Sequence, residues 1–365
     1  MGKIRVGLLF GGRSVEHEVS LSSATSIYHA LDAERYDVSL IAIDHEGRWR
    51  LGSGSELLPE QAIHGEEVNL PAVPGSSLTP VDPGAAADST HSLDVVFPII
   101  HGRGGEDGKL QGLLEMAEVP YVGSGVLSSA VQMDKDVARR LLAASGLPVV
   151  PDVVLRTVDP STPQERRSAA EAAVDALGLP VFVKPANSGS SIGISKASDL
   201  SSLLESIDRA ARFDTKVVIE KALDAREIEV AVLGNACPEA SVPGEIVPNQ
   251  EFYDYEAKYL NESTELLVPA PLPEDLSKRI RSLALEAFQA LEGEGIARVD
   301  FFLEKETGEI YINELNSLPG FTEGSMFPRL WAASGLPYPA LLDRMIDLAI
   351  ERHSQRSKLV THYTS

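Results

Sequence analysis

Residues 4–31 read IRVGLLFGGRSVEHEVSLSSATSIYHAL, and this stretch decides the fold of the N-terminal part of the chain. It opens with Ile4–Phe10, a short apolar run of the kind found in buried strands. The run ends on Gly11-Gly12, and a helical pattern follows from Ser20 to Leu31. A strand, a glycine turn and a helix in this order predict the first unit of an α/β fold with a doubly wound parallel sheet.

Two further strand-like runs, 38–43 and 94–100, extend this pattern. In doubly wound sheets, ligands bind at the carboxyl ends of the strands, where Gly11 and His101 fall. Residues 51–92 are different, because they carry five Pro, five Gly, six acidic residues and no Lys or Arg. This composition predicts an irregular surface insertion in the first domain.

Length and charge limit the classes of function. The 365 residues suggest two or three domains, and 32 Lys+Arg against 54 Asp+Glu give a formal net charge of −22. A chain this acidic is not expected to bind nucleic acid or an anionic membrane. The single cysteine, Cys237, excludes an internal disulfide framework, and no apolar run is long enough for a signal peptide or a membrane span. We therefore expect a cytoplasmic protein.

Helix and strand signals in the rest of the chain predict two more α/β units. Asp134 can cap a helix that ends before Gly146, and residues 162–165 form a capping box whose helix closes at Gly178. The other expected elements are strands at 149–155, 181–184, 217–220, 228–233, 265–268, 299–303 and 310–315 and a helix over 276–291. The chain is expected to fray after Ile350. The predicted domains are 1–125, 126–215 and 216–365.

Three familiar signatures fail on their spacing. Residues 103–110 approach a Walker A loop, but Arg103 stands where glycine is required. His17-Glu18 is not followed by histidine at position 21, so it is not the helix of a zinc protease. Neither Gly11-Gly12 nor the cluster at 102–108 has the Gly-x-Gly-x-x-Gly spacing of a dinucleotide turn.

Residues 184–193, KPANSGSSIG, are more informative. A predicted strand delivers Lys184, and a loop of small residues with two glycines follows it. Backbone N–H groups of such a loop can close over an anion, as in a phosphate-covering flap. A flexible surface loop is the alternative interpretation.

Residues 298–316 predict a β-hairpin with a metal site. Alternation places these side chains on one face of their respective strands: Arg298, Asp300, Ile312, Glu314 and Asn316. Carboxylate and amide oxygens that converge from adjacent strands suit Mg²⁺. A solvated hairpin face is the alternative.

Alone, Lys135, the pair Glu220-Lys221 and the loop 252–259 would be unremarkable. Together with the flap and the hairpin they resemble the ATP-grasp superfamily, and within it the D-alanine–D-alanine ligase family. Five motifs carry this resemblance: Phe10–Ser20, His101–Gly108, Met133–Lys135, Tyr253–Tyr259 and Asn316–Gly320. They occur in order from about residue 4 to residue 350, and the 51–92 insertion lies outside them.

The resemblance implies an N-terminal doubly wound domain followed by two ATP-grasp subdomains. It also implies the reaction. ATP phosphorylates the carboxylate of one D-alanine, and the amine of a second D-alanine attacks the acyl phosphate, which supplies D-alanyl-D-alanine for peptidoglycan precursors. Two Mg²⁺ ions take part, Mn²⁺ can substitute for them, and a monovalent cation is a candidate activator. A homodimer is also implied.

The same resemblance assigns nucleotide and metal roles by position. The residues implied to bind ATP are Lys135, Lys184, Ser190, Ser191, Glu220, Lys221, Leu223, Glu227, Lys258, Asn313 and Glu314. The first two lysines and Lys258 would face the phosphates, Glu227 the ribose, and residues 220–223 the adenine. The two Mg²⁺ ions would be held by Asp300, Glu314 and Asn316. We expect the cations to converge and to make the phosphate site locally basic.

For the amino-acid substrates, the implied residues are Glu16, Val19, His101, Ser190, Tyr259, Arg298, Gly320 and Ser325. Glu16 would pair with the ammonium of the first D-alanine, beside Val19 and His101, in a hydrogen-bonded set with Ser190 and Tyr259. The oxyanion would be stabilised by Arg298 and the Gly320 N–H, because a glycine permits close backbone approach. The carboxylate of the second D-alanine would lie at Ser325.

Tyr259 bears on the second substrate, because family members that make D-Ala-D-lactate often carry Phe at this loop position. Tyrosine therefore favours D-alanine over D-lactate or another second substrate. A catalytically inactive nucleotide-binding or regulatory protein is a more distant alternative. It is disfavoured, because such a protein has no physical need for Arg298, Asp300 and Glu314 together.

Overall fold

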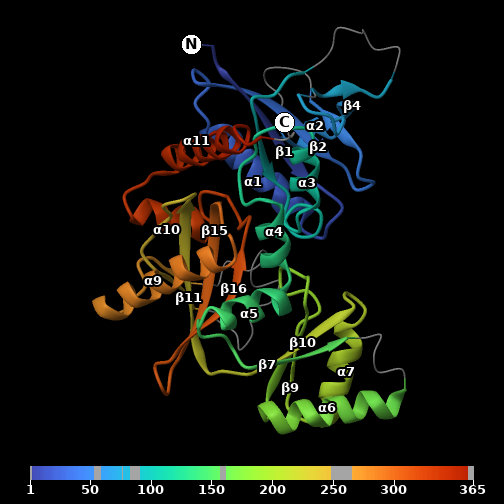
Figure 1. Ribbon diagram of the computed structural model, residues 1–365, viewed down its shortest axis with the longest axis vertical. Coiled ribbons are helices and arrows are strands. Elements are labelled where there is room, and N and C mark those ends of the chain that lie inside the picture. Colours follow the sequence, from blue (N-terminus) through green and yellow to red (C-terminus); the bar gives the residue numbers. More distant parts are fainter. Residues whose placement is uncertain are drawn as a thin grey trace.

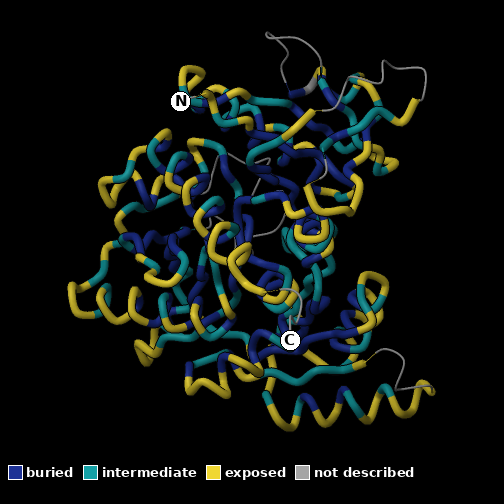
Figure 2. The backbone as a smooth tube through the Cα atoms, turned by 45° about the horizontal axis from the view of Figure 1, so that its top comes forward, coloured by how far each residue is buried: buried dark blue, intermediate teal, exposed yellow. Residues whose placement is uncertain are grey.

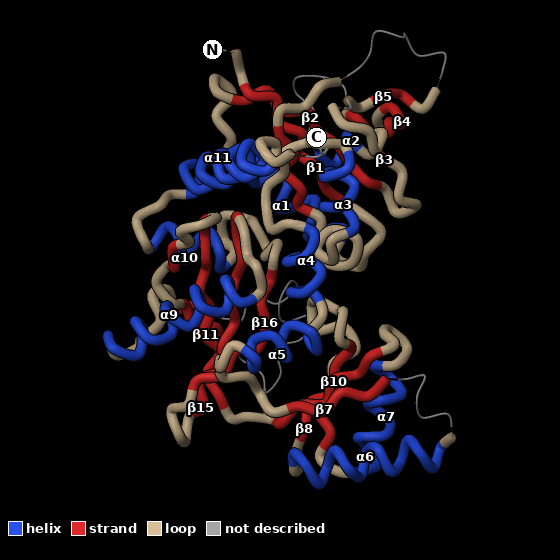
Figure 3. Tube along the Cα trace, in the orientation of Figure 1, coloured by secondary structure: helices blue, strands red, loops and turns tan. Residues whose placement is uncertain are grey.

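The structure is a computed structural model that describes residues 2–52, 59–75, 77–82, 91–156, 162–247 and 265–360. Three β-sheets follow one another along the chain (Figures 1 and 3). The first sheet lies at one end of the molecule, the third in the middle and the second at the other end (Figure 1). Lys258 and Tyr259 lie outside the described residues.

The first sheet is built on β1 (Ile4–Gly11), which pairs in parallel with β2 (Tyr36–Ile43) and β6 (Val95–Ile99). Helix α1 (His17–Ala30) connects β1 to β2, and α3 (Lys109–Met116) follows β6. The predicted order of strand, glycine turn, helix and strand is confirmed.

Both faces of this parallel arrangement are covered, as expected for strands that are apolar throughout. Leu8 and Phe10 belong to the core that includes Ile27 of α1. Leu9 belongs to a separate core that includes Leu114 of α3. The carboxyl end of β1 and the loop after β6 are therefore fixed between two packed layers.

The prediction of an irregular insertion at 51–92 is wrong for much of its described part. Three antiparallel strands extend the first sheet beyond β2. They are β3 (Trp49–Leu51), β4 (Glu66–Asn69) and β5 (Thr79–Pro80). The short helix α2 (Pro59–Ala62) packs against β2 and α1. The reason is apolar burial, since the insertion places four apolar side chains in the core around α3: Leu51, Val68, Leu70 and Leu78.

The second sheet is antiparallel, in the order β7-β10-β8-β9. Its strands are β7 (Asp152–Arg156), β8 (Val181–Pro185), β9 (Ser195–Ala197) and β10 (Lys216–Lys221). Helices α6 (Pro163–Leu177) and α7 (Leu200–Ala210) pack on one core with this sheet. The capping box is confirmed: Thr162 Oγ1 accepts from the Glu165 N–H at 3.2 Å, and the Glu165 carboxylate accepts from the Thr162 N–H at 2.9 Å.

The third sheet has the order β14-β13-β11-β15-β16, with β12 also paired to β11. Its strands are β11 (Ala225–Gly234), β12 (Glu239–Ala240), β13 (Gly244–Val247), β14 (Glu265–Leu267), β15 (Gly295–Glu304) and β16 (Ile310–Asn316). Alternate residues of β11 face two cores: Val230 packs with α9 (Glu274–Ala290), and Ala231 with α10 (Met326–Ala333). The strands and the long helix predicted for this unit are confirmed.

Helices α4 (Val126–Met133) and α5 (Lys135–Ala144) connect the first sheet to the rest. Asp134 caps α5 as predicted, accepting from the Val137 N–H at 3.1 Å. The apolar side of α5 packs in the core of the third sheet through Ala138 and Leu142. This packing fixes Lys135, the first residue of α5, beside the third sheet.

Helix α11 (Tyr338–Arg356) runs past Ile350, so the prediction that the chain frays there is wrong. Arg352 is buried, and its guanidinium donates to the carbonyls of Tyr121 (2.9 Å) and Gly123. The polar composition of this segment suggested solvent exposure and did not indicate that Arg352 has buried partners. These bonds hold the C-terminal helix against the chain that leaves the first sheet (Figure 1).

Burial follows the sheets: the strands are mostly buried, and the helices expose their outer turns (Figure 2). In the described part of the chain, no helix combines the length and the apolar character that crossing a membrane requires.

Candidate active site

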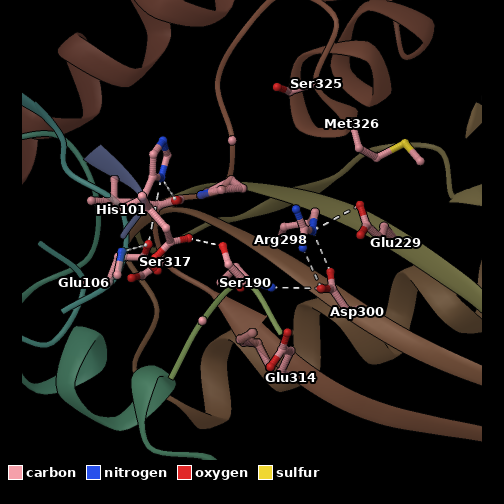
Figure 4. A pocket seen from close by; sticks show the side chains of 18 of the residues that line it. His101, Glu106, Ser190, Glu229, Arg298, Asp300, Glu314, Ser317, Ser325 and Met326 are labelled. Atoms are coloured by element: carbon pink, nitrogen blue, oxygen red, sulfur yellow. Dashed lines mark hydrogen bonds and ion pairs between the residues drawn. The ribbon is translucent and has the colours of Figure 1, made fainter. Parts of the chain in front are cut away.

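A cavity of about 570 Å³ is lined by segments that belong to all three sheets. The first sheet contributes Glu16 and Val19 at the start of α1 and His101 after β6. The loop after β8 contributes residues 188–190, and the third sheet contributes β11, β15 and β16. Figure 4 shows His101, Ser190 and Arg298 converging from elements far apart in the sequence.

Arg298 on β15 is the centre of the ionic contacts in this cavity (Figure 4). Its Nε and Nη2 donate to the two carboxylate oxygens of Asp300, each at 2.7 Å, and Nε lies 3.1 Å from Glu229 Oε2 on β11. Burial opposes the charge, yet Asp300 and Glu229 hold the pKa of Arg298 well above its ordinary value. Arg298 is therefore a fixed cation in a preorganised position.

A β-bulge shapes the partner strand. Asp300 pairs with Glu314, but Phe301 pairs with Ile312, so Asn313 has no partner across the ladder. The prediction that Ile312 shares a face with Glu314 is wrong, because Ile312 packs in the core together with Leu315. The extra residue turns Asn313 towards the cavity, which it lines.

Lys135 and Glu314 meet across the cavity. Lys135 Nζ lies 3.0 Å from Glu314 Oε2 and donates to the Ser188 carbonyl at 2.8 Å. Lys135 is buried, whereas the Glu314 side chain is 23% exposed. Lys135 thus links Glu314, a carboxylate expected to bind metal, to the loop after β8.

Glu16 and Ser190 form the contact that the family resemblance implied. Ser190 Oγ donates to Glu16 Oε1 across a sequence separation of 174 residues. Ser190 and Ser191 have φ of 48° and 57°, a conformation that residues other than glycine rarely adopt. Gly102 has φ of 77°, and a side chain there would collide with the Glu16 carboxylate. Tyr259, the third member of the predicted set, lies outside the described residues.

Gly320 and Ser325 lie side by side at another part of the lining. A Cβ on Gly320 would come within 3.4 Å of Ser325 Oγ. This hydroxyl is 2.8 Å from Thr322 Oγ1, accepts from the Thr322 N–H at 3.1 Å and precedes α10. The N-terminal end of α10 therefore points its positive dipole end at this part of the cavity.

Glu106 lies in the site, although no role was predicted for it. Its Oε1 accepts from the Gly102 N–H at 2.8 Å and lies 3.9 Å from His101 Nδ1. Burial and the nearby Glu16 raise the pKa of Glu106 to about 8, and burial lowers the pKa of His101. The motif at 101–108 was quoted as a resemblance, but a carboxyl kept neutral by its surroundings has no sequence signal of its own.

Lys184 borders the cavity without lining it. Its Nζ is 2.6 Å from Glu220 Oε1 and 3.5 Å from Asn313 Oδ1, and Arg139 of α5 binds the other oxygen of Glu220. Burial opposes ionisation of Glu220, but Lys184 and Arg139 hold its pKa below the ordinary value. Sequence reasoning missed Arg139, since a basic residue inside a helix is usually solvated.

The cavity is acidic. The described basic residues of its lining are Lys135 and Arg298, and apart from the neutral Glu106 the acidic ones are Glu16, Glu18, Glu227, Glu229, Asp300 and Glu314. The described protein groups at the expected phosphate site are therefore mostly acidic, and Lys184 pairs with Glu220. The expected basic site also counted Lys258, which lies outside the described residues, and Mg²⁺. A polyanion can enter such a site only together with added cations.

Known families match this chain along most of its length. The model for the D-ala D-ala ligase N-terminus covers residues 5–124, and the model for the D-ala D-ala ligase C-terminus covers residues 141–347. The chain belongs to the D-alanine–D-alanine ligase family. The family resemblance inferred from the five motifs is confirmed.

Other members of the family are similar to this chain over almost their full length. D-alanine–D-alanine ligase A from Chromobacterium violaceum is 51% identical and 96% of each chain is covered. The ligase from Shouchella clausii is 47% identical, with 98% of each chain covered. The solved D-alanine–D-alanine ligase from Coxiella burnetii has a TM-score of 0.84 at 36% identity and covers 98% of this chain and 96% of its own.

A further solved neighbour is the VanG D-Ala:D-Ser ligase from Enterococcus faecalis, with a TM-score of 0.84 and 32% identity. It covers 95% of this chain and 100% of its own. The expected three-unit α/β ATP-grasp architecture is confirmed by these neighbours.

The cavity gathers most, but not all, of the site residues that the family resemblance implied. Those that line it are Glu16, Val19, His101, Lys135, Ser190, Glu227, Arg298, Asp300, Asn313, Glu314, Asn316, Gly320 and Ser325. Those described elsewhere are Lys184, Ser191, Glu220, Lys221 and Leu223. Lys221 is exposed at the end of β10, and the sequence could not distinguish it from its buried neighbour Glu220.

The oxygen cluster fits the divalent metal that this ATP-using family employs. Asp300 and Glu314 are register partners, and Asn316 Nδ2 donates to Asp300 Oδ2 at 2.9 Å, which leaves the amide oxygen available. Carboxylate and amide oxygens with no nitrogen or sulfur ligand suit a hard cation. The acidic lining gives a physical reason for its presence.

Proposed function

We propose that this family member uses ATP to join two D-alanines in the cavity described above, through an acyl phosphate. The observation that carries the proposal is the Arg298–Asp300–Asn316 cluster in one cavity with the Glu16–Ser190 bond. The first group suits phosphate, metal and oxyanion, and the second suits an ammonium.

Glu16 holds the ammonium of the first D-alanine. Ser190 donates to Glu16 Oε1, which leaves Oε2 to accept from the substrate. Val19 provides an apolar contact for the methyl group, and buried His101 limits the space beside it. The flap thereby orients the carboxylate that must receive the γ-phosphoryl group.

Two bond changes follow. A carboxylate oxygen of the first D-alanine attacks the γ-phosphorus, and ADP leaves. The amine of the second D-alanine then attacks the carbonyl carbon, phosphate leaves, and the amine loses a proton. Arg298 and the Gly320 N–H stabilise the oxyanion of this second step, because Arg298 is already fixed by Asp300 and Glu229.

Ser325 binds the carboxylate of the second D-alanine. Its hydroxyl is oriented by Thr322, and the first turn of α10 adds backbone N–H groups and a positive dipole end. Both interactions favour a carboxylate over an uncharged group.

The nucleotide lies against Lys135, Ser190, Glu227, Asn313 and Glu314, with further contacts to Lys184, Ser191, Glu220, Lys221, Leu223 and Lys258. Asp300, Glu314 and Asn316 would hold two Mg²⁺, for which Mn²⁺ can substitute. When bound, these ions neutralise phosphate charge and act as Lewis acids. A monovalent cation is proposed as an activator.

Tyr259 completes the Glu16–Ser190 set and favours D-alanine as the second substrate. The acting form is proposed to be a cytoplasmic homodimer whose product enters peptidoglycan synthesis. Its proposed domains are 1–125, 126–215 and 216–365.

The test is phosphate release with ATP and Mg²⁺ and with D-alanine, D-serine or D-lactate as the second substrate. We expect turnover with D-alanine alone and a product of two D-alanines. Preferred use of D-serine, as the name of the VanG neighbour would suggest, or of D-lactate would overturn the substrate assignment. Release that does not require any amino acid would overturn the reaction itself.

A further inference from the structure

We propose that His17, Glu18 and His45 form a second metal site, which takes Zn²⁺ and is separate from the oxygen cluster. Atoms of these three side chains that can bind a metal lie within 4.8 Å of one another. His17 and Glu18 begin α1, and His45 lies in the turn between β2 and β3. The family resemblance assigned no role to any of them.

His17 is held ready to bind. It is buried, and its Nδ1 lies 2.9 Å from the carbonyl oxygen of Gly12. Because a carbonyl can only accept, Nδ1 carries the hydrogen and Nε2 keeps its lone pair. This is the arrangement by which proteins fix the tautomer and ring orientation of metal-binding histidines.

The other two side chains can adapt. Glu18 and His45 are exposed, and the His45 ring stacks on His17 with centroids 4.0 Å apart and planes at 30°. Ligand atoms about 2.1 Å from one Zn²⁺ are ~3.4 Å apart in a tetrahedral site. Stacked imidazole rings point their in-plane lone pairs side by side, so one ion can bind both histidines only if the exposed His45 ring turns out of the stack.

The ligand set selects the class of metal. Two imidazole nitrogens, one carboxylate oxygen and an open fourth position are typical of Zn²⁺ and unsuited to Mg²⁺. The cluster formed by Asp300, Glu314 and Asn316 offers oxygen atoms and has the opposite preference. The two sites should therefore be distinguishable by the choice of ion.

A metal ion bound at this site would link the start of α1 to the turn between β2 and β3. His17 directly follows Glu16, and Gly12 N also donates to the Ile43 carbonyl at 2.8 Å, close to the turn that carries His45. A metal held by both histidines would act as a clamp on the backbone that presents Glu16. The proposal does not depend on the proposed reaction, since binding is measured without substrates.

The test is a titration of the full-length, metal-free protein with Co²⁺, a spectroscopic substitute for Zn²⁺, in excess Mg²⁺. Mg²⁺ occupies the oxygen cluster, and four-coordinate Co²⁺ with imidazole ligands absorbs far more strongly in the visible range than octahedral Co²⁺ on oxygen. We expect one equivalent to give the strong spectrum and to be displaced by Zn²⁺.

His45→Ala and Glu18→Gln should each weaken Co²⁺ binding by at least about tenfold. His29→Ala, an exposed histidine at the other end of α1, should bind as the wild type does. Zn²⁺ should raise the Tm of the wild type and of His29→Ala by a few degrees, but not that of His45→Ala. Equal binding by wild type and His45→Ala, or a spectrum of octahedral form alone, would overturn the proposal.

Discussion

The β15–β16 hairpin and the loop after β8 both supply side chains to the cavity, but they hold them there in different ways. On the hairpin, Arg298, Asp300 and Asn316 bind one another within a short stretch of the same sheet. The loop instead contacts Glu16 through Ser190, across 174 residues of sequence. Glu16 lies directly before α1, in the unit of the first sheet. The first arrangement is local and the second depends on how two sheets approach each other.

This difference predicts a division of labour. Groups fixed within one hairpin are preorganised whether or not substrate is bound, and such groups stabilise charge in a transition state. A contact between sheets forms when the site closes, and it positions a substrate while excluding water. Changes on the hairpin should therefore lower kcat, and changes at the Glu16–Ser190 contact should chiefly raise KM.

The largest effect is expected for Glu314→Gln. The amide cannot pair with Lys135 as a carboxylate does, and it is a weaker ligand for a divalent cation. We expect kcat for D-alanine-dependent phosphate release to fall by roughly 10³-fold or more, comparable to or beyond the loss of one oxyanion donor. Steady-state kinetics at saturating ATP and D-alanine measure this.

The matched control is Glu306→Gln, an exposed glutamate in the turn of the same hairpin. It should retain wild-type kinetics. If Glu314→Gln kept more than a tenth of the wild-type kcat, the hairpin would not be the preorganised half of the site.

The second effect is that of Glu16→Gln. Removing the charge weakens the pairing with a substrate ammonium by about 1.5–3 kcal/mol, which is roughly 10- to 100-fold in the KM for the first D-alanine. The KM for ATP should change little, because the phosphate-side groups remain. A loss confined to kcat with an unchanged KM for D-alanine would contradict the division.

A smaller effect is expected for Ser190→Ala. It removes the donor to Glu16 but leaves the carboxylate that pairs with the ammonium, so the substrate loses positioning and keeps its ion pair, a loss of about 0.5–1.5 kcal/mol. The KM for D-alanine should rise about 2- to 10-fold. Ser198→Ala, an exposed serine just beyond the loop, is the control. A kcat reduced as severely as in Glu314→Gln would make Ser190 part of the charge-stabilising group instead.

The same contrast explains what could be predicted from the sequence. Strand alternation brought Arg298 and Asp300 together correctly, because their pairing is local. It misplaced Ile312, since a bulge that inserts one residue reverses the alternation and leaves no mark in the pattern. Family motifs, not periodicity, connected Glu16 to Ser190, because no local rule relates residues on different sheets.

Buried charges escaped prediction for a related reason. The Lys184–Glu220–Arg139 network and Arg352 depend on three-dimensional partners, so each residue alone suggests a solvated side chain. The 51–92 segment was misjudged on composition, because four apolar side chains at the right positions outweigh many prolines and glycines.

The smallest effect concerns Glu106, which lies beside Glu16 on the first-sheet side of the contact. Burial and Glu16 raise its pKa from 4.5 to about 8, so between these values the folded protein binds a proton that the unfolded chain has released. Stability contributed by this proton is lost as the pH rises towards 8.

The variant Glu106→Gln mimics the protonated form of Glu106 and cannot lose the proton. Between pH 6.5 and 8, the Tm of the ligand-free wild type should therefore fall by roughly 2 °C relative to that of Glu106→Gln. His101 is common to both proteins, and since its pKa is lowered on folding, its contribution changes mainly below the chosen range. Parallel Tm curves for the two proteins would mean that Glu106 is ionised at neutral pH, and that the first-sheet side of the contact carries two negative charges instead of one.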